Sequence, residues 1–321
     1  MDCILALDAG GTKCDALLID VAGHVIGYGS DSTPGIGGRD ARAVQYAAAR
    51  ALTRHEFGIL HVIALGQYLP LNVFSTTKAD YYNIIVCTES TSAFSHAGIS
   101  RGAVLLAGTG AFAHAYTRDD RHRHLDGTGP MLGDFGGGYH VGTMALNAIV
   151  RSDWHPRHRT SLRDRILKHF NVPCPEALFG LQLFSRDRSV VASVARIVAE
   201  EADSGDAVAA EILRRAAQTL AETFRDLVTG LGIADEEYTA IGTGSLIRRS
   251  DIYWNELWAC ATRIAPRFVP CRLKEPPVIS LAIHALRQVQ GDYAATAIAA
   301  LMSEYKEPVS PALPPRNGNG L

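Results

Sequence analysis

Two stretches that lie far apart in the chain share one pattern of residues. The first reads Leu5-Ala-Leu-Asp-Ala-Gly-Gly-Thr-Lys13 and the second reads Leu105-Leu-Ala-Gly-Thr-Gly-Ala111. Each predicts an apolar strand, a turn of Gly and Thr, and a second strand, which covers Ala16–Asp20 or Phe112–Tyr116. Glycine has no Cβ, so the backbone N–H groups of such a turn can approach a phosphate closely. We expect two lobes whose turns hold one polyphosphate from opposite sides, although ordinary β-hairpin loops often have the same composition.

The strands predicted around these turns repeat as a unit. Cys3–Asp8, Asp15–Asp20 and His24–Gly29 predict a meander, and a second meander begins at Ala103–Ala107. Further strands are predicted over His61–Leu65, Asn83–Thr88 and Tyr238–Ile241. The β-branched run before Glu89 indicates a buried strand. Strands that alternate with helices indicate an α/β protein.

Helices are predicted where apolar residues recur at helical spacing. They cover Arg39–Leu52, Ser90–Ala97, Tyr139–Arg151, Val190–Ala202, Ala207–Leu231, Asp251–Ala265, Val278–Gln290 and Asp292–Tyr305. The apolar face of Ala207–Leu231 suits either the core or a dimer interface, and the pattern does not separate the two. Residues 307–321 are rich in Pro and Gly, so we expect a disordered tail.

The composition excludes several classes of protein. With 47% apolar residues, 20% charged residues and a net charge of −2, the chain is expected to be globular, without the basic footprint of a nucleic-acid or membrane-surface protein. No apolar run is long enough for a bilayer, and a strand is predicted directly after Met1, so we expect no membrane span and no signal peptide. The 6 cysteines stand singly, which favours a reducing, cytoplasmic location.

The order of these segments resembles the superfamily of actin, sugar kinases and heat-shock ATPases, and more narrowly the N-acetylglucosamine kinases and BadF/BcrA-type ATPases. Asp8–Lys13 is similar to the first phosphate motif, Ala107–Gly110 to the second, and Ile241–Ser245 to the adenosine motif. Asp126–Gly142 is similar to the sugar-side segment, and Asp292–Ala299 to the last helix of animal-type enzymes. The resemblance implies a two-lobed actin-like (ribonuclease H-like) α/β fold with a duplicated βββαβαβα core.

This resemblance also implies which residues bind ATP, Mg²⁺ and a sugar. The nucleotide would contact the residues of the three turns, namely Gly10, Gly11, Thr12, Lys13, Gly108, Thr109, Gly110, Gly242, Thr243 and Gly244. Asp8 would hold Mg²⁺ through water, because this ion keeps several of its waters in proteins. The acceptor would be bound by Thr33, Thr109, Gly129 and Asp134.

Glu89 occupies the position where the family has its general base. The family places an Asp there, after the strand that Asn83–Thr88 matches. A base must come within about 2.6–3.2 Å of the acceptor hydroxyl, and the extra methylene of Glu moves the carboxylate. Alternatively, Glu89 favours the start of the following helix, because a carboxylate is stabilised at a helix N-terminus. Both interpretations stay open, and we predict Glu89 and Asp8 as the catalytic residues.

Two more residues depart from the family pattern around the sugar. Pro34 follows Thr33 where the family has an Asn that contacts the sugar, and proline offers neither a side-chain amide nor an N–H group. Phe135 replaces a Glu of the sugar-side segment. The segment between Leu65 and Asn83 is also shorter than in the family, which has a helix there. These departures indicate a different substrate or a lost activity.

Two histidine-rich stretches, Arg121–His124 and His155–Arg159, suggest metal sites at first sight. Arginines alternate with the histidines and repel a cation, and no Cys or carboxylate stands at ligand spacing. We therefore predict solvated loops at both places.

The sequence thus predicts an ATP-dependent kinase that acts on an amino sugar, an N-acetylhexosamine, or a related sugar or cyclitol. The alternative is a nucleotide- or sugar-binding protein without turnover. A redox-activating ATPase is disfavoured, because its relatives hold an iron–sulfur cluster with closely placed cysteines, which are absent from this sequence. We expect residues 1–100 with 291–306 in the first lobe, 101–290 in the second and, from the resemblance, a homodimer.

Overall fold

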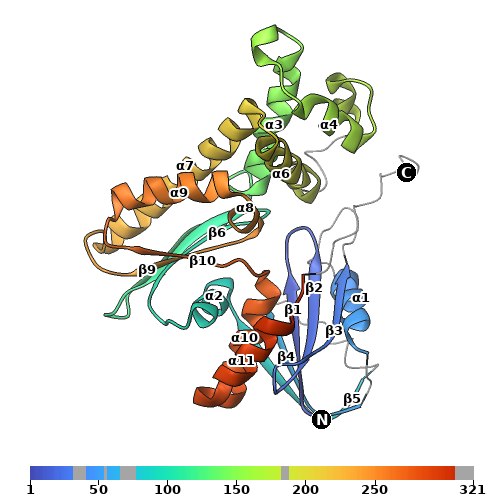
Figure 1. The fold of residues 1–321 in the computed structure, drawn as a ribbon, viewed down its shortest axis with the longest axis vertical. Helices are drawn as coiled ribbons and strands as arrows, with labels where there is room; N and C mark the ends of the chain where they lie inside the picture. The colour runs from blue at the N-terminus through green and yellow to red at the C-terminus, as the bar shows by residue number, and fades with distance from the viewer. Residues whose placement is uncertain (32–40, 54–55, 66–76, 182–187, 308–321) are drawn as a thin grey trace.

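The structure, a computed structural model, describes residues 1–31, 41–53, 56–65, 77–181 and 188–307, which form two five-stranded sheets with helices on their faces (Figure 1). The first sheet contains β1 (Cys3–Ala9), β2 (Cys14–Asp20), β3 (Val25–Asp31), β4 (Glu56–Leu65) and β5 (Lys78–Cys87). The second sheet contains β6 (Gly102–Ala107), β7 (Ala111–Tyr116), β8 (His122–Asp126), β9 (Thr239–Thr243) and β10 (Val269–Arg272).

Both sheets have the same strand order. The first is ordered β3-β2-β1-β4-β5, and the second, read from its other edge, β8-β7-β6-β9-β10. In each sheet the first three strands form an antiparallel meander, and the last two run parallel to the first strand. The predicted duplication of an α/β unit is therefore confirmed. Segment 66–76, between β4 and β5, lies outside the described residues.

Every helix predicted from the sequence is present. The helices are α1 (Ala41–Ala51), α2 (Glu89–Ala97), α3 (Gly138–Ser152), α4 (Leu162–Phe170), α6 (Arg188–Asp203), α7 (Ala207–Leu231), α8 (Ser245–Arg249), α9 (Asp251–Ile264), α10 (Pro277–Gln290) and α11 (Ala294–Glu304). Short 3-10 turns cover Pro156–His158, Pro175–Leu181 and Gly291–Tyr293. Neither α4 nor α8 was predicted. None of the described helices is long and apolar enough to cross a membrane.

The central strands of the first sheet are mostly apolar and are buried on both faces. Along β1, Leu5 and Leu7 pack with α1, whereas Ile4 and Ala6 pack with α10. This alternation follows from the pleat of a strand, in which successive side chains point to opposite faces. Helices on both faces explain why the strand reads as a continuous apolar run rather than as an alternating one.

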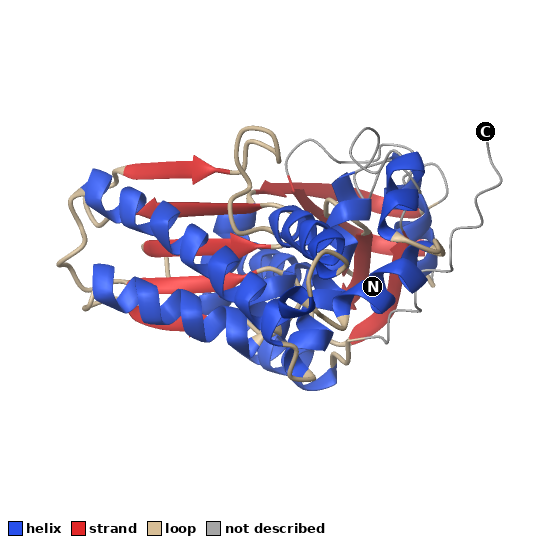
Figure 2. Cartoon of the chain, turned by 90° about the horizontal axis from the view of Figure 1, so that it is seen from above, coloured by secondary structure: helices blue, strands red, loops and turns tan. Residues whose placement is uncertain are grey.

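The second sheet is covered by long helices on one face and by α2 on the other. Seen from above, two long helices run side by side along its strands (Figure 2), and the apolar face of α7 is buried in this core. This packing assigns the face of α7 to the core rather than to a dimer interface. On the opposite face, Phe94 of α2 packs with Phe112 and Ile241.

The helix that follows the last strand of each repeat packs on the other repeat's sheet. The chain leaves the first sheet into α2, which packs on the second sheet, and leaves the second sheet into α10, which packs on the first. The predicted range 101–290 placed α10 with the second lobe, whereas its buried face contacts the first sheet. The division into lobes stays a prediction, and we propose to assign α10 to the first lobe.

Three local predictions were wrong. The strand before Glu89 is not buried but forms the edge strand β5, where Tyr81, Ile84 and Val86 are exposed, because a β-branched run indicates a strand and not its place in a sheet. Residues 122–124 are not a loop but part of β8, which pairs with β7. Residue 307, predicted to begin the disordered tail, forms two ion pairs. Residues 308–321 lie outside the described residues.

The second histidine-rich stretch agrees with its prediction. It is an exposed segment with one 3-10 turn, Pro156–His158. Cys3, Cys14 and Cys87 are buried, as expected for small apolar side chains in strands.

Candidate functional site

The first Gly/Thr turn joins β1 to β2 as a tight hairpin. The last strand pair is Ala9 with Cys14, and the N–H of Gly10 donates to the carbonyl of Lys13 at 2.9 Å. The turn is therefore a β-hairpin, as the simpler interpretation of its sequence requires. A hairpin geometry does not exclude anion binding, because the N–H groups at the tip of such a turn can still point outward.

The second turn joins β6 to β7 in the same way. The strands pair up to Ala107 and Ala111, and the N–H of Gly108 donates to the carbonyl of Gly110 at 2.9 Å. The same local sequence thus produces a hairpin at the same place in both sheets. The duplicated pattern of residues corresponds to a duplicated structure.

The two turns touch each other. The hydroxyls of Thr12 and Thr109 lie 2.8 Å apart and share a hydrogen bond across 97 residues of sequence. Gly11 allows this approach, since a Cβ at that position would lie 3.0 Å from the Cβ of Thr109. The structure therefore brings together the two turns that the sequence placed in separate repeats.

Three carboxylates gather beside the first turn. Asp8 is the last residue but one of β1, Asp15 is the second residue of β2, and Glu89 starts α2. The pKa of Asp8 is raised to about 7, first by burial and then by the charges of Asp15 and Glu89, against the opposing charges of Lys13 and Arg248. Negative charge at Asp8 is thus incompletely compensated by the protein.

Asp15 is a structural member of this group. Its carboxylate accepts hydrogen bonds from the hydroxyls of Tyr28, at 2.7 Å, and Ser30, at 2.6 Å. Lys13 Nζ lies 2.9 Å from the other oxygen. The lysine that was predicted to contact the nucleotide therefore pairs with Asp15 here, and its ammonium stays beside the first turn.

These residues fit a magnesium ion better than a metal that needs a full set of protein ligands. No group of three or more His, Cys, Asp or Glu side chains within the described ranges is placed to hold an ion. Mg²⁺ is usually bound by one or two carboxylates, waters and substrate phosphates. The raised pKa of Asp8 indicates a carboxylate that a nearby cation would stabilise in its charged form.

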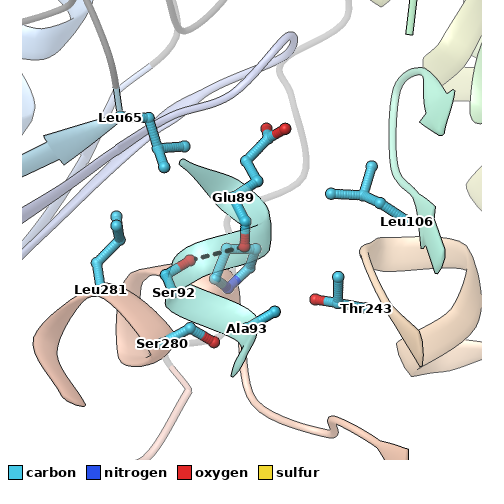
Figure 3. Close-up of a pocket in the computed structure, with 9 residues that line it drawn as sticks. Leu65, Glu89, Ser92, Ala93, Leu106, Thr243, Ser280 and Leu281 are labelled. Carbon is cyan, nitrogen blue, oxygen red and sulfur yellow. Dashed lines mark hydrogen bonds between the residues drawn. The ribbon is translucent and has the colours of Figure 1, made fainter. Parts of the chain in front are cut away.

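Glu89 lines a small cavity between the two sheets. The cavity has room for about 20 Å³, close to the volume that one water needs, and it is also lined by Leu65, Leu106 and Thr243. The side chain of Glu89 extends away from α2, while the carbonyl of Glu89 accepts from the hydroxyl of Ser92 at 2.9 Å (Figure 3).

The N-cap of α2 is Thr88, whose hydroxyl accepts from the N–H of Thr91 at 3.1 Å. The capping hydrogen bond is therefore already made without Glu89.

The predicted sugar-side segment lies directly behind the second turn. The N–H groups of Gly138 and Tyr139 donate to the carbonyls of Gly108 and Thr109, at 2.7 and 3.0 Å. Asp134 is buried, and its carboxylate accepts from the N–H of Ala111 at 3.3 Å. The side chain of Asp134 thus lies beside the first residue of β7, next to the turn.

Other residues of this segment hold it in place. Asp126 accepts from the N–H of Gly127 at 2.7 Å and from that of Phe135 at 2.8 Å. The carbonyl of Gly129 accepts from Gly133 at 2.8 Å, so Gly129 belongs to an internal turn of the segment. The side chain of Phe135 is half exposed. A large apolar ring therefore faces solvent where the resembled family has a carboxylate.

The third predicted turn is instead the end of β9, which includes Gly242 and Thr243, and only Gly244 follows the strand and contacts the second turn. Gly244 has a φ of 93°, and a Cβ there would lie 2.4 Å from the carbonyl oxygen of Ala107. Only glycine suits this combination of conformation and close approach. Gly242, Thr243 and Gly244 therefore lie beside the second Gly/Thr turn. Thr33 and Pro34 fall outside the described residues.

Three residues of the site were not predicted from the sequence. Asp15 lies within an apolar strand, Arg188 starts α6 with one nitrogen 3.9 Å from an oxygen of Asp134, and Arg248 lies on α8. Asp15 follows Lys13 closely, which is a weak local signal. Arg188 and Arg248 carry no such signal, because only the packing of distant elements brings them here.

Comparisons with known proteins agree with this arrangement. The solved structure of a provisionally assigned N-acetylglucosamine kinase from Chromobacterium violaceum is similar with a TM-score of 0.60 and 17% identity, over 88% of this chain and 98% of that one. A glucokinase of the ROK family from Streptomyces griseus, in complex with glucose and AMPPNP, is similar with a TM-score of 0.57 and 15% identity, again over 88% of this chain and 98% of that one. At these identities the likeness concerns the fold, which is the two-lobed α/β fold of actin-like sugar kinases.

The sequence also matches curated proteins over part of its length. It is 28% identical over 154 residues to the N-acetyl-D-glucosamine kinase of Dictyostelium discoideum, which is 47% of this chain and 48% of that protein. The match thus spans about half of this relative. Residues 5–257 match the BadF/BadG/BcrA/BcrD ATPase family, and the chain therefore belongs to that family.

Proposed function

We propose that the chain is an ATP-dependent kinase that transfers the γ-phosphoryl group to a hydroxyl of an amino sugar, an N-acetylhexosamine, or a related sugar or cyclitol. The observation that carries this proposal is the meeting of the two Gly/Thr turns beside Asp8. The membership in an ATPase family and the N-acetylglucosamine kinase among the relatives support the same class of reaction.

In this proposal the two turns hold the phosphates of ATP between them. Phosphoryl transfer depends mainly on positioning and on neutralising charge, which the backbone N–H groups of residues 11–13 and 109–110 would supply, because those of Gly10 and Gly108 already donate within the hairpins. The contact between Thr12 and Thr109 must then open to admit the nucleotide. Mg²⁺, when bound, would neutralise phosphate charge, and Asp8 is the residue that would hold it, through water.

The acceptor would bind on the side of Asp134 and Glu89. Asp134 accepts a hydrogen bond from a sugar hydroxyl, and Glu89 takes the proton of the attacking hydroxyl. The acceptor oxygen then forms its bond to the γ-phosphorus while the bond to the bridging oxygen of ADP breaks. Closure of the lobes would exclude water, which otherwise competes as the acceptor. We further propose a cytoplasmic homodimer, as expected from the sequence.

A release assay for ADP tests this function. Mg-ATP is offered with a panel of hexosamines, N-acetylhexosamines, neutral sugars and cyclitols, and the rate is compared with a blank lacking acceptor. The proposal predicts turnover with at least one acceptor and its loss in Glu89→Gln. No turnover with any acceptor, together with Mg-ATP binding in calorimetry, would instead favour a binding protein without catalysis, which the exposed Phe135 at the sugar-side segment also favours.

A further inference from the structure

After α11, the chain contacts the second repeat through Glu307, which forms ion pairs with Arg248 and Arg249. Both oxygens of Glu307 are engaged: one lies 2.8 Å from Nη2 of Arg248, and the other lies 2.6 Å from Nη2 of Arg249. A carboxylate bound by two guanidinium groups in this way uses the same donors that would bind phosphate oxygens. The C-terminal segment therefore places an anion on a ready-made anion site.

Arg248 is unusual for its burial. Its side chain is only 5% exposed, and its Nε donates to the carbonyl of Lys274 at 2.9 Å. The carbonyl of Arg248 in turn accepts from Arg272 at 3.2 Å. The guanidinium is thus held by the carbonyl of Lys274 and the carboxylate of Glu307, and the backbone of the same residue is held by Arg272. A buried charge is strongly destabilising without a partner of opposite sign, and Glu307 is that partner here.

The position of Arg248 connects this pair to the phosphate turns. Residue 248 lies on α8, which begins directly after the Gly242–Gly244 turn. Its charge lowers the pKa of Asp8, which lies near the end of β1 beside the first turn. An anion bound by Arg248 would therefore lie at the same end of both sheets as the turns that are proposed to hold the polyphosphate.

We propose that Arg248 and Arg249 form an additional binding site for the phosphate groups of the nucleotide, and that Glu307 occupies this site in the nucleotide-free chain. This inference rests on the proposed function, in that the ligand is a nucleoside triphosphate or diphosphate. A phosphate carries more negative charge and more acceptor oxygens than a carboxylate, so it displaces Glu307 from the arginines. The affinity for nucleotide is then reduced by the fraction of chains in which Glu307 holds the site.

Calorimetric titration with sodium tripolyphosphate and with Mg-ADP tests the proposal. Glu307→Gln removes the competing charge and is expected to tighten the binding of both probes about fivefold, the lower end of ordinary coupling between two sites. Arg249→Gln is expected to weaken binding by a similar factor. Its side chain is 51% exposed, so the substitution leaves the buried Arg248 in place. In the double variant the gain from Glu307→Gln should disappear.

Glu304→Gln is the matched control. Glu304 lies on the same C-terminal segment but pairs with His24 and accepts from the N–H of Val25 at 3.1 Å. Its substitution should leave both affinities unchanged. Thermal unfolding of each variant shows whether it is folded, and Glu307→Ala gives a second variant in which the carboxylate is absent.

Either of two results would overturn the proposal. One is unchanged or weaker binding of tripolyphosphate in folded Glu307→Gln and Glu307→Ala. The other is an equal gain from Glu307→Gln whether or not Arg249 is present. Failure of the proposed kinase is a separate result, because it is the absence of ADP release with every acceptor. A chain without turnover that still shows the predicted shifts in tripolyphosphate affinity would retain the anion site.

Discussion

The two Gly/Thr turns have the same hairpin geometry but very different surroundings. The first turn is flanked by charged side chains: Asp8, Lys13 and Asp15 all lie within or beside it. The second is flanked by the start of α3, whose N–H groups donate to the carbonyls of Gly108 and Thr109, and by a single buried carboxylate, that of Asp134. The repeated unit thus determines where a turn lies, and the residues around it determine what it can do. We infer that the first turn supplies the charge that holds Mg²⁺ and that the second turn supplies a rigid frame.

The strongest test of this division is Asp8→Asn. If the first turn supplies the charge that holds Mg²⁺, the substitution should lower kcat/KM of the kinase by about a thousandfold, the upper range for loss of one electrostatic contact in an active site. Steady-state ADP release at saturating Mg²⁺ measures this. Asp203→Asn, at the exposed end of α6, is the control and should be silent. An Asp8 variant with nearly normal kcat/KM would show that the chemistry does not depend on the first turn.

Glu89→Gln addresses the other predicted catalytic residue. Loss of a general base should lower kcat by about a hundredfold, the lower range for this kind of catalysis. Thr88→Ala is the matched variant, since it removes the N-cap of α2 and should cost about 1 kcal/mol of stability while leaving most of the activity. Equal effects of the two substitutions on kcat would indicate that Glu89 stabilises the start of α2 and does not act as the general base.

The glycines of the two turns should differ in their tolerance of alanine. A Cβ at Gly110 would lie 2.4 Å from the carboxylate of Asp134, whereas one at Gly11 meets the Thr109 side chain at 3.0 Å. Asp134 is buried and hydrogen-bonded, so Gly110→Ala should lower the free energy of unfolding by about 1–3 kcal/mol, as overpacking commonly does. We expect a smaller loss for Gly11→Ala in urea unfolding. Equal losses would contradict a rigid second turn.

The pH dependence of stability should report the charge at the first turn. The pKa of Asp8 is raised from 3.8 to about 7, so ionised Asp8 is disfavoured in the folded chain. Below its pKa in the unfolded chain, this carboxyl therefore does not lower the free energy of unfolding. Between that pKa and the pKa in the folded chain, it lowers the free energy of unfolding increasingly as the pH rises. Relative to Asp8→Asn, the Tm of the wild type should fall by about 2–4 °C between pH 5 and pH 8.

Magnesium provides the control for this titration. Added Mg²⁺ should reduce the difference in Tm between the wild type and Asp8→Asn at pH 8 and leave that difference unchanged at pH 5, because only ionised Asp8 binds the cation. Scanning fluorimetry of both chains across the pH series measures the difference. A difference in Tm that is constant with pH would mean that the pKa of Asp8 is not raised in the folded chain.

The sequence predicted those parts of the fold that depend on local pattern. Gly10–Thr12 and Gly108–Gly110 were located because small residues between apolar runs indicate hairpins, and the structure confirms that both form. The edge position of β5 and the pairing of β8 were missed, since both depend on neighbours that are distant in the sequence. The composition of the Pro-rich tail wrongly predicted disorder at Glu307, which pairs with two arginines.

The roles of the site residues were less accessible from the sequence than the fold. Asp8, Glu89 and Asp134 were named from a resemblance, and their chemical roles stay predictions. Arg248 could not have been predicted, because its importance comes from burial beside Lys274 and from a partner 59 residues further along the chain. The exchange of α2 and α10 between the sheets likewise depends on tertiary packing alone.

The most direct test of the central claim is hydrogen exchange at the two turns during a titration with Mg-ATP. If both turns hold one nucleotide, the amides of residues 11–13 and 109–110 should become protected together, with one midpoint that matches the calorimetric Kd. Protection of one turn alone, or midpoints that differ between the turns, would contradict a single polyphosphate held from both sides.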